Sequence, residues 1–278
     1  MGEIVADLHM HSTCSDGLHT PEALCELIVN KGINAFSLTD HDSVQGLSRL
    51  KNCEVAAIIP GLELTATMND KEAHILGYYI DPENRELVDT LKAIRKKRIE
   101  RLLEIVDYLG KSGAAHIDAD DFVAELGDGG FNRLNLARYM VKKGLAKSLD
   151  HCFKKFIGES AKAYRPVNYF SPSKAVELIH HAGGLAFLAH PYTNNIHNII
   201  PELVECGLDG LEAFHPSHGP SEIKGCLEWA ARFKLGVSGG SDFHGNSNSP
   251  RQLLSAGLDG ERLVEFLALR PDRNMVTV

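Results

Sequence analysis

The chain lacks an uninterrupted apolar run of the roughly 18 residues that a membrane-spanning helix requires. Its opening residues, Met-Gly-Glu-Ile-Val-Ala-Asp, have neither the basic start nor the apolar centre of a secretory signal. These two absences lead us to expect a cytoplasmic protein with no membrane partner.

Paired cysteine motifs and an excess of basic charge are also missing. The six cysteines show no CxxC motif and no short repeated spacing. We therefore expect reduced thiols rather than a disulfide framework or a zinc knuckle. The formal net charge of -8 gives no global basic surface for long duplex nucleic acid. It still permits a locally positive pocket for a small phosphate ester.

Histidine and acidic residues, by contrast, gather wherever an apolar run ends. Five such motifs occur in the order HxH (9–11), TDHD (39–42), GLE (61–63), AHP (189–191) and GSDFHG (240–245). Alternate side chains of a strand share one face and residues rise by about 3.3 Å, so Asp7, His9 and His11 lie on one face at intervals of roughly 6.6 Å. Two imidazoles placed in this way can bind one cation.

Short apolar runs alternate with helical patterns in the first 80 residues and again after residue 172, which is typical of strand-helix units. A count of about seven strands favours a barrel in which every strand ends at one rim, where the five motifs fall. An open doubly wound sheet would also gather its ligands at strand ends. The expected fold is α/β, a distorted (β/α)7-type barrel formed by residues 1–82 and 167–278.

The pattern changes at Asp81-Pro82, after which a long charged helix and further helical segments follow. We expect residues 83–166 to form a helical insertion domain that acts as a lid or substrate domain.

The five motifs resemble those of the PHP family, the polymerase and histidinol phosphatase metal-dependent phosphoesterases. The similarity is greatest to the bacterial branch of nucleotide phosphatases and short-RNA exonucleases. It covers residues 3–80 and 172–245, and the helical stretch is similar to an insertion of that branch. One HxH motif alone is weak evidence, whereas five motifs in this order rarely arise by chance.

The resemblance implies nine ligands for two or three divalent metal ions. They form three groups: His9, His11, Glu63 and Asp242; Glu63, His74 and His190, with Glu63 bridging; and Asp16, His41 and His244. Carboxylates offset the charge of adjacent dications, while neutral imidazoles add ligands without further charge. A shell of nitrogen and oxygen without thiolate suits manganese, iron or zinc, and the resemblance favours manganese.

Residues around the metals are expected to support them and to bind substrate. Asp7 and Asp40 stand beside metal-binding histidines, and we expect at least one to accept an imidazole N–H and so fix its tautomer. The resemblance implies that Arg133 contacts phosphate, although Asn135 replaces a histidine often found there. It also implies that His218 is a phosphate ligand or a general acid, with Glu212 supporting the site.

The expected activity is hydrolysis of a phosphate ester by a multinuclear metal-activated hydroxide. The substrates that the resemblance implies are a nucleoside monophosphate, a nucleoside 3',5'-bisphosphate or the 5' end of short RNA. Three alternatives stay open: a histidinol-phosphate-type phosphatase, an amidohydrolase, which also begins with HxH on an early strand, and a non-catalytic metal-binding regulatory module. The complete ligand set argues against the last.

Overall fold

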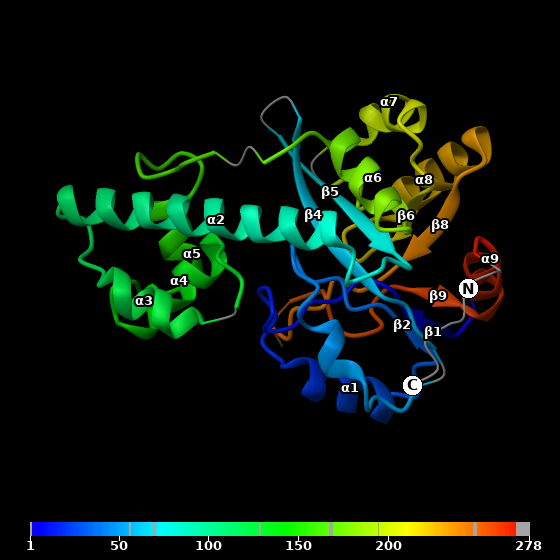
Figure 1. The fold of residues 1–278 in the computed structure, drawn as a ribbon, viewed down its shortest axis with the longest axis horizontal. Helices are drawn as coiled ribbons and strands as arrows, with labels where there is room; N and C mark the ends of the chain where they lie inside the picture. The colour runs from blue at the N-terminus through cyan, green and yellow to red at the C-terminus, as the bar shows by residue number, and fades with distance from the viewer. Residues whose placement is uncertain are drawn as a thin grey trace. The chain divides into compact units, whose positions relative to one another are not determined.

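The computed structural model describes residues 2–55, 57–68, 71–127, 129–166, 169–193, 195–246 and 249–270. Along these residues the chain has a mixed α/β fold (Figure 1). Contacts between residues divide it into two compact units, the first formed by residues 1–89 and 168–278 and the second by residues 90–167. All the strands described lie in the first unit.

A four-stranded sheet has the order β3-β2-β1-β9. The strands β1 (Ile4–Asp7), β2 (Ala35–Phe36) and β3 (Ala57–Ile58) are parallel, and β9 (Leu258–Asp259) is antiparallel to β1. The sequence did not predict β9, because two residues are too short to show a strand pattern.

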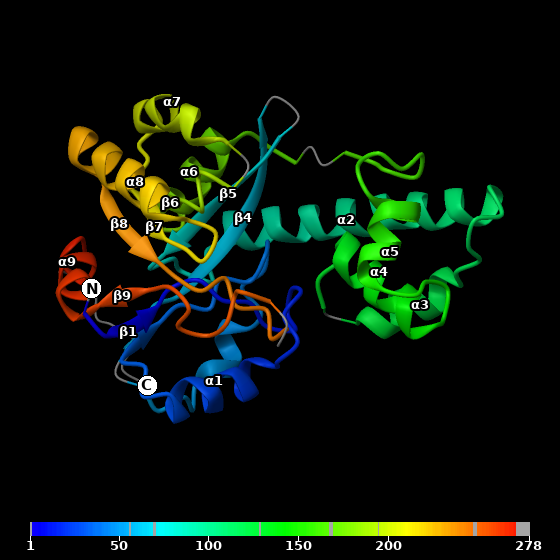
Figure 2. The ribbon, with the colours of Figure 1, turned by 180° about the vertical axis from the view of Figure 1, so that it is seen from behind.

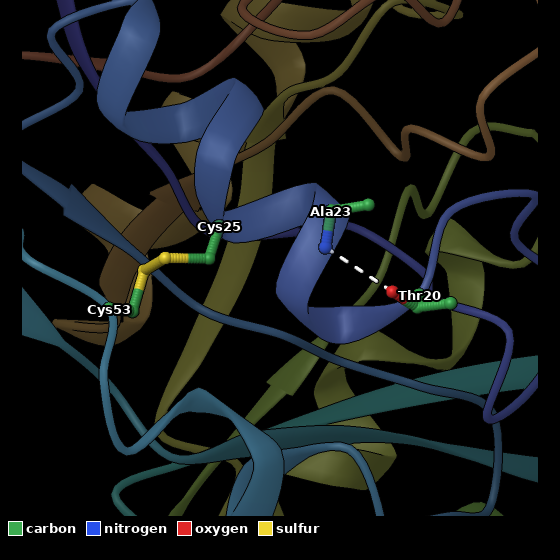
Figure 3. Close-up of a disulfide and its surroundings, with 4 residues drawn as sticks. All are labelled: Thr20, Ala23, Cys25 and Cys53. Carbon is green, nitrogen blue, oxygen red and sulfur yellow. Dashed lines mark hydrogen bonds between the residues drawn. A yellow bond between two sulfur atoms is a disulfide. The ribbon is translucent and has the colours of Figure 1, made fainter.

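Helix α1 (Pro21–Asn30) connects β1 to β2. The Thr20 side chain accepts a hydrogen bond from the Ala23 amide, and Pro21 occupies the first turn, where its missing N–H costs nothing (Figure 3). Both signals stand in the sequence, and they mark the start of this helix.

A five-stranded sheet has the order β4-β5-β6-β7-β8. Its strands are β4 (Gly61–Met68), β5 (Lys71–Tyr78), β6 (Leu185–Leu188), β7 (Gly210–Phe214) and β8 (Gly236–Gly239). Helix α6 (Pro172–His181) packs on β4, β5 and β6, and α8 (Pro220–Phe233) packs on β7 and β8. Figure 2 shows both helices beside this sheet, together with α7 (Ile200–Glu205).

The predicted α/β class is confirmed, but the structure describes two sheets where the sequence predicted one closed barrel. Strand β5 is antiparallel to both β4 and β6, so the strands do not all end at one rim. An apolar run carries no mark of its direction, which is why the sequence did not predict this reversal. Isolated bridges connect the two sheets, one from Met10 to Phe243 beyond the ends of β1 and β8, and one from His41 to Glu63 of β4.

Aromatic side chains fill the core of the first unit. The Tyr78 ring meets Phe187 edge-on at 5.1 Å between ring centroids, and it meets Phe266 of α9 (Gly260–Ala268) at 5.2 Å. All three side chains are fully buried or nearly so. Edge-to-face pairs of this kind add to the free energy gained from burial and fix where the strands lie.

The second unit is helical in its described residues. It contains most of α2 (Arg85–Lys111), together with α3 (Ala119–Leu126), α4 (Arg133–Lys142), α5 (Leu149–Cys152) and the π-helical turn η2 (Phe153–Ile157). Its own hydrophobic core includes Ile105, Phe122, Leu136 and Met140. None of the helices described in either unit combines the length and the apolar character needed to cross a lipid bilayer.

The prediction of reduced thiols is wrong for two of the six cysteines. Cys25 of α1 and Cys53 form a disulfide, with their Cα atoms 5.7 Å apart (Figure 3). The two residues are 28 positions apart, so no local motif announces the pair; it depends on how α1 packs against the segment after the 3-10 helix η1 (Leu47–Leu50). Cys14, Cys152, Cys206 and Cys226 are free. The cytoplasmic location stays a prediction.

Candidate metal centre

The structure brings the side chains of all nine predicted ligands together in the first unit. Each belongs to at least one group whose candidate ligand atoms all lie within 4.8 Å of one another. The groups are His11, Asp16, His41 and His244; His9, His190 and Asp242; His9, His11 and Glu63; and His41, Glu63 and His74. They overlap in His9, His11, His41 and Glu63, so the nine residues form one cluster.

The cluster lies where the two sheets meet. His9 and His11 follow β1, and Asp242 and His244 follow β8. The His9 carbonyl accepts a hydrogen bond of 2.8 Å from the Asp242 amide, which fixes these two segments side by side. Gly240 is required here, because a Cβ at this position would lie 2.3 Å from the backbone nitrogen of His9.

A second pair of backbone hydrogen bonds between the two sheets fixes the position of Glu63. The Asp42 amide donates to the Glu63 carbonyl at 2.9 Å, and the Glu63 amide donates to the Asp40 carbonyl at 3.2 Å. His74 enters from the neighbouring β5, where it pairs in register with Thr65. His74 therefore comes from the middle of a reversed strand rather than from a strand end.

Glu63 is the centre of the cluster, because its two carboxylate oxygens face five imidazoles. Oε2 of Glu63 lies 3.2 Å from His9 Nε2, 3.3 Å from His11 Nε2 and 3.1 Å from His41 Nδ1. Oε1 lies 2.8 Å from His74 Nδ1 and 3.3 Å from His190 Nε2. A carboxylate in this position can bridge two cations, each oxygen serving one of them.

Asp242 presents its two oxygens to different groups. Oδ1 faces the cluster, 3.1 Å from His11 Nε2 and 3.4 Å from His244 Nδ1. Oδ2 faces away from it, 2.6 Å from Arg251 Nη1 and 3.3 Å from His215 Nε2. The backbone of Asp242 has a φ of 50°, a conformation that a non-glycine residue adopts at a cost and that often marks a functional site.

The charges of the cluster depend on one another. Burial raises the pKa of the Glu63 carboxyl, but the imidazoles of His41 and His74 outweigh burial and hold that pKa well below its usual value. Burial lowers the pKa of His11, but Asp242 and Glu63 outweigh it and raise the pKa to about 9. In the same way Glu63 raises the pKa of His74 to about 10 against the effect of burial. Burial lowers the pKa of His41 to about 4, so in the absence of metal it is His11 and His74 that keep protons beside the buried carboxylates.

The cluster fits bound divalent cations. His9 Nε2, His11 Nε2, His41 Nδ1 and His74 Nδ1 are buried and form no hydrogen bond, although each lies close to Glu63. A buried polar atom without a partner costs free energy, and a cation among these four nitrogens would satisfy them. Six imidazoles and three carboxylates without a thiolate are a ligand set suited to divalent transition metals.

The expected roles of Asp7 and Asp40 are corrected by their contacts. The Asp7 carboxylate accepts hydrogen bonds from the backbone amides of Ser241 and Leu254, and burial raises its pKa to about 6. The Asp40 carboxylate accepts from the amide and hydroxyl of Ser12 and from the hydroxyl of Ser15. Neither accepts an imidazole N–H, because their oxygens accept from backbone amides and serine hydroxyls instead.

Glu212 provides the contact that was expected of Asp7 or Asp40. Its Oε1 accepts from His9 Nδ1 at 2.9 Å, and its Oε2 accepts from the His190 amide at 2.9 Å. The hydrogen bond from His9 places the imidazole proton on Nδ1, so that Nε2 faces the cluster as a candidate metal ligand. The sequence associated Glu212 with the site but gave no indication of this contact.

The two residues expected to bind phosphate, His218 and Arg133, belong to different units. His218 is buried, its Nδ1 donates to the Ala213 carbonyl at 3.0 Å, and burial lowers the pKa of its imidazole. Arg133 belongs to the second unit, where its guanidinium lies 4.8 Å from the centre of the Tyr164 ring. Arg251, which contacts Asp242, was missed because it lies outside the five motifs.

Comparison with known proteins identifies the family. Residues 7–120 match the PHP domain. A 5'-3' exoribonuclease of Haemophilus influenzae is 33% identical over 252 residues, which cover 86% of this chain and 89% of that protein. A 3',5'-nucleoside bisphosphate phosphatase of Chromobacterium violaceum is 30% identical over 257 residues, covering 89% of this chain and 90% of that protein.

The fold agrees with this result. A crystal structure described as a metal-dependent phosphoesterase of Bifidobacterium adolescentis superimposes with a TM-score of 0.84 and 27% identity, covering 95% of each chain. The fold and the cluster define the class of metal-dependent phosphoesterases. The chain belongs to the PHP family and is a phosphoric ester hydrolase, whose histidine, aspartate and glutamate cluster is able to hold several metal ions.

Proposed function

We propose that this protein removes phosphate from a small nucleotide, either a nucleoside 3',5'-bisphosphate or monophosphate, or acts on the 5' end of short RNA. The observation that carries the proposal is the placement of Glu63 among five imidazoles, four of which turn toward it a buried nitrogen that forms no hydrogen bond. The substrate classes are supported by the exoribonuclease and the bisphosphate phosphatase to which the chain is similar.

The nine clustered residues would hold two or three divalent ions. The thiolate-free ligand set suits manganese, iron or zinc, and the resemblance to the PHP family favours manganese. Ions bound there would polarise a phosphate ester and supply the activated water that attacks it. The protein contributes the positions of the ligands. Glu212 accepts hydrogen bonds from the ring of His9 and from the backbone amide of His190. The amides of Ser241 and Leu254 hold the carboxylate of Asp7.

We assign substrate choice to the helical insertion expected at residues 83–166, as a lid or substrate domain with Arg133 as its phosphate-binding residue; most of it belongs to the compact unit of residues 90–167. This helical unit has a core of its own and interrupts the first unit in sequence between β5 and β6. It can therefore vary without disturbing the metal cluster.

A phosphate-release screen of the manganese-reconstituted protein tests the proposal. The panel contains nucleoside monophosphates, 3',5'-bisphosphates, histidinol phosphate and short RNA with a 5' phosphate, and ammonia release is followed in parallel. Phosphate release from a bisphosphate or from short RNA, abolished by a chelator and restored by manganese, is the expected result. Turnover of histidinol phosphate alone, or release of ammonia, would contradict the proposal.

A further inference from the structure

Arg251 joins the metal cluster from a segment outside the five sequence motifs. Its Nη1 lies 2.6 Å from Oδ2 of Asp242, whose side chain is buried while that of Arg251 is 35% exposed. Asp242 also meets His215, but Arg251 is the partner whose charge does not depend on pH. A permanent cation therefore stands at the boundary between the cluster and solvent.

The guanidinium of Arg251 has donors to spare. An arginine carries five N–H donors arranged as a planar fork. Only Nη1 has a charged partner, and among the described residues no group accepts a hydrogen bond from Nε or Nη2 of Arg251. The side chain of Arg251 is 35% exposed, so a ligand in solvent can reach it.

An approaching phosphate would meet a concentration of negative charge beside Arg251. The Asp242 and Glu63 carboxyls are both buried, and Oδ1 of Asp242 and Oε2 of Glu63 lie 3.1 Å and 3.3 Å from the same atom, Nε2 of His11. A phosphate brought next to Asp242 is repelled by that carboxylate unless a cation stands between them. The fork of Arg251 matches two phosphate oxygens and is already fixed at one edge by Asp242.

We propose that Arg251 is a substrate-binding residue that holds the reacting phosphate monoester beside Asp242. The inference rests on the proposed function for the identity of the substrate, but it makes a separate claim about phosphate binding. One edge of the guanidinium is held by Oδ2 of Asp242, and the opposite edge binds two oxygens of the phosphate.

The test uses the metal-loaded protein and two readouts, calorimetric titration with inorganic phosphate and steady-state kinetics. The variants are Arg251→Gln and Arg251→Lys, with Arg232→Gln as the matched control. Arg232 is an exposed arginine of α8 that stacks 5.4 Å from the Trp229 ring and has no contact with the cluster. Metal content per chain is measured for every variant by plasma mass spectrometry.

We expect Arg251→Gln to weaken phosphate binding and to raise KM by about 10- to 100-fold, the range lost with one charge-assisted pair of hydrogen bonds. Arg251→Lys keeps the charge without the fork and should fall between this variant and the native protein. Arg232→Gln should match the native protein, and kcat and metal content should change little in all variants.

Unchanged phosphate affinity and KM in Arg251→Gln would overturn the inference. So would a loss of bound metal in proportion to the loss of phosphate affinity, because Arg251 would then act on the metal through Asp242. A failure of the proposed function would give a different result, because the native protein would bind phosphate but release none from any nucleotide. The phosphate titration of Arg251→Gln would still decide the role of Arg251 in that case.

Discussion

Nδ1 of His9 lies 2.9 Å from Oε1 of Glu212, and both side chains are fully buried. The carboxylate thereby sets the tautomer of an imidazole whose other nitrogen faces Glu63 at 3.2 Å. Glu212 also accepts the His190 amide, so one buried acid positions two segments that follow different strands. Contacts of this kind decide whether the cluster is pre-formed before a cation binds.

The substitution Glu212→Gln tests this role. A glutamine has one acceptor oxygen and one donor nitrogen, so it cannot accept from both His9 and the His190 amide. We expect metal affinity to fall by about 10- to 100-fold, the usual effect of losing such a supporting contact. Competition with a fluorescent chelator measures this affinity. Glu228→Gln, at an exposed position of α8, should leave it unchanged; equal affinities for Glu212→Gln and the native protein would contradict the role assigned to Glu212.

The stability of the metal-free protein should depend on pH in the alkaline range. The acidic partners of His11 and His74 outweigh burial and raise the pKa of these imidazoles from 6.5 to about 9 and about 10. Above pH 6.5 the folded chain keeps protons that the unfolded chain releases. The contribution of these two histidines to the free energy of unfolding is therefore fully present below pH 6.5 and is lost as the pH rises through about 9 to 10.

Thermal unfolding in a chelator, followed across this pH interval, measures the effect. His74→Gln should flatten the slope, while His116→Gln, at an exposed position of the second unit, should keep it. Metal affinity should rise over the same interval, since metal binding requires deprotonated imidazoles. A metal-free protein whose stability rises toward alkaline pH would show that these histidines are not protonated in the cluster.

Reduction of the Cys25–Cys53 disulfide should destabilise the first unit. The bond closes a loop between residues 28 positions apart, and the chain-entropy estimate for a loop of this length is about 3–4 kcal/mol at 25 °C. Urea unfolding with and without a phosphine reductant measures the difference. Cys206→Ser, which removes an exposed free thiol, is the control. Identical unfolding midpoints under the two conditions would mean that the bond does not form in solution.

Substitutions in the two units should separate catalysis from substrate binding. Asp242→Ala or His9→Ala removes a side chain of the cluster and should abolish turnover. Arg133→Ala, in the second unit, should mainly raise KM by about 10-fold or more with a smaller change in kcat. Initial rates over a range of substrate concentrations distinguish these outcomes. Unchanged rates for both cluster variants would exclude the cluster as the catalytic site.

Much of this structure could be predicted from the sequence because the signals are local. Thr20 and Pro21 mark the start of α1, and the apolar run of residues 185–188 is β6. The HxH and GSDFHG motifs carry their ligands at fixed spacing after a strand, so the meeting of His9, His11, Asp242 and His244 required only that β1 and β8 end near each other.

The features that could not be predicted from the sequence depend on packing between distant segments. The reversal of β5 follows from a hairpin with β4, and the closeness of Cys25 to Cys53 follows from the packing of α1. Glu212 and Arg251 reach the cluster from positions whose neighbours in sequence carry no metal-ligand pattern. The positive φ of Asp242 is likewise imposed by its surroundings, because local sequence does not favour it.

The central claim is that one cluster around Glu63 binds several divalent ions, and anomalous X-ray diffraction from crystals grown with manganese tests it most directly. We predict at least two anomalous peaks, each within about 2.0–2.5 Å of ligand atoms of the cluster and with Glu63 between them. Crystals with full manganese available but no peak beside Glu63, His9 or Asp242 would contradict the account.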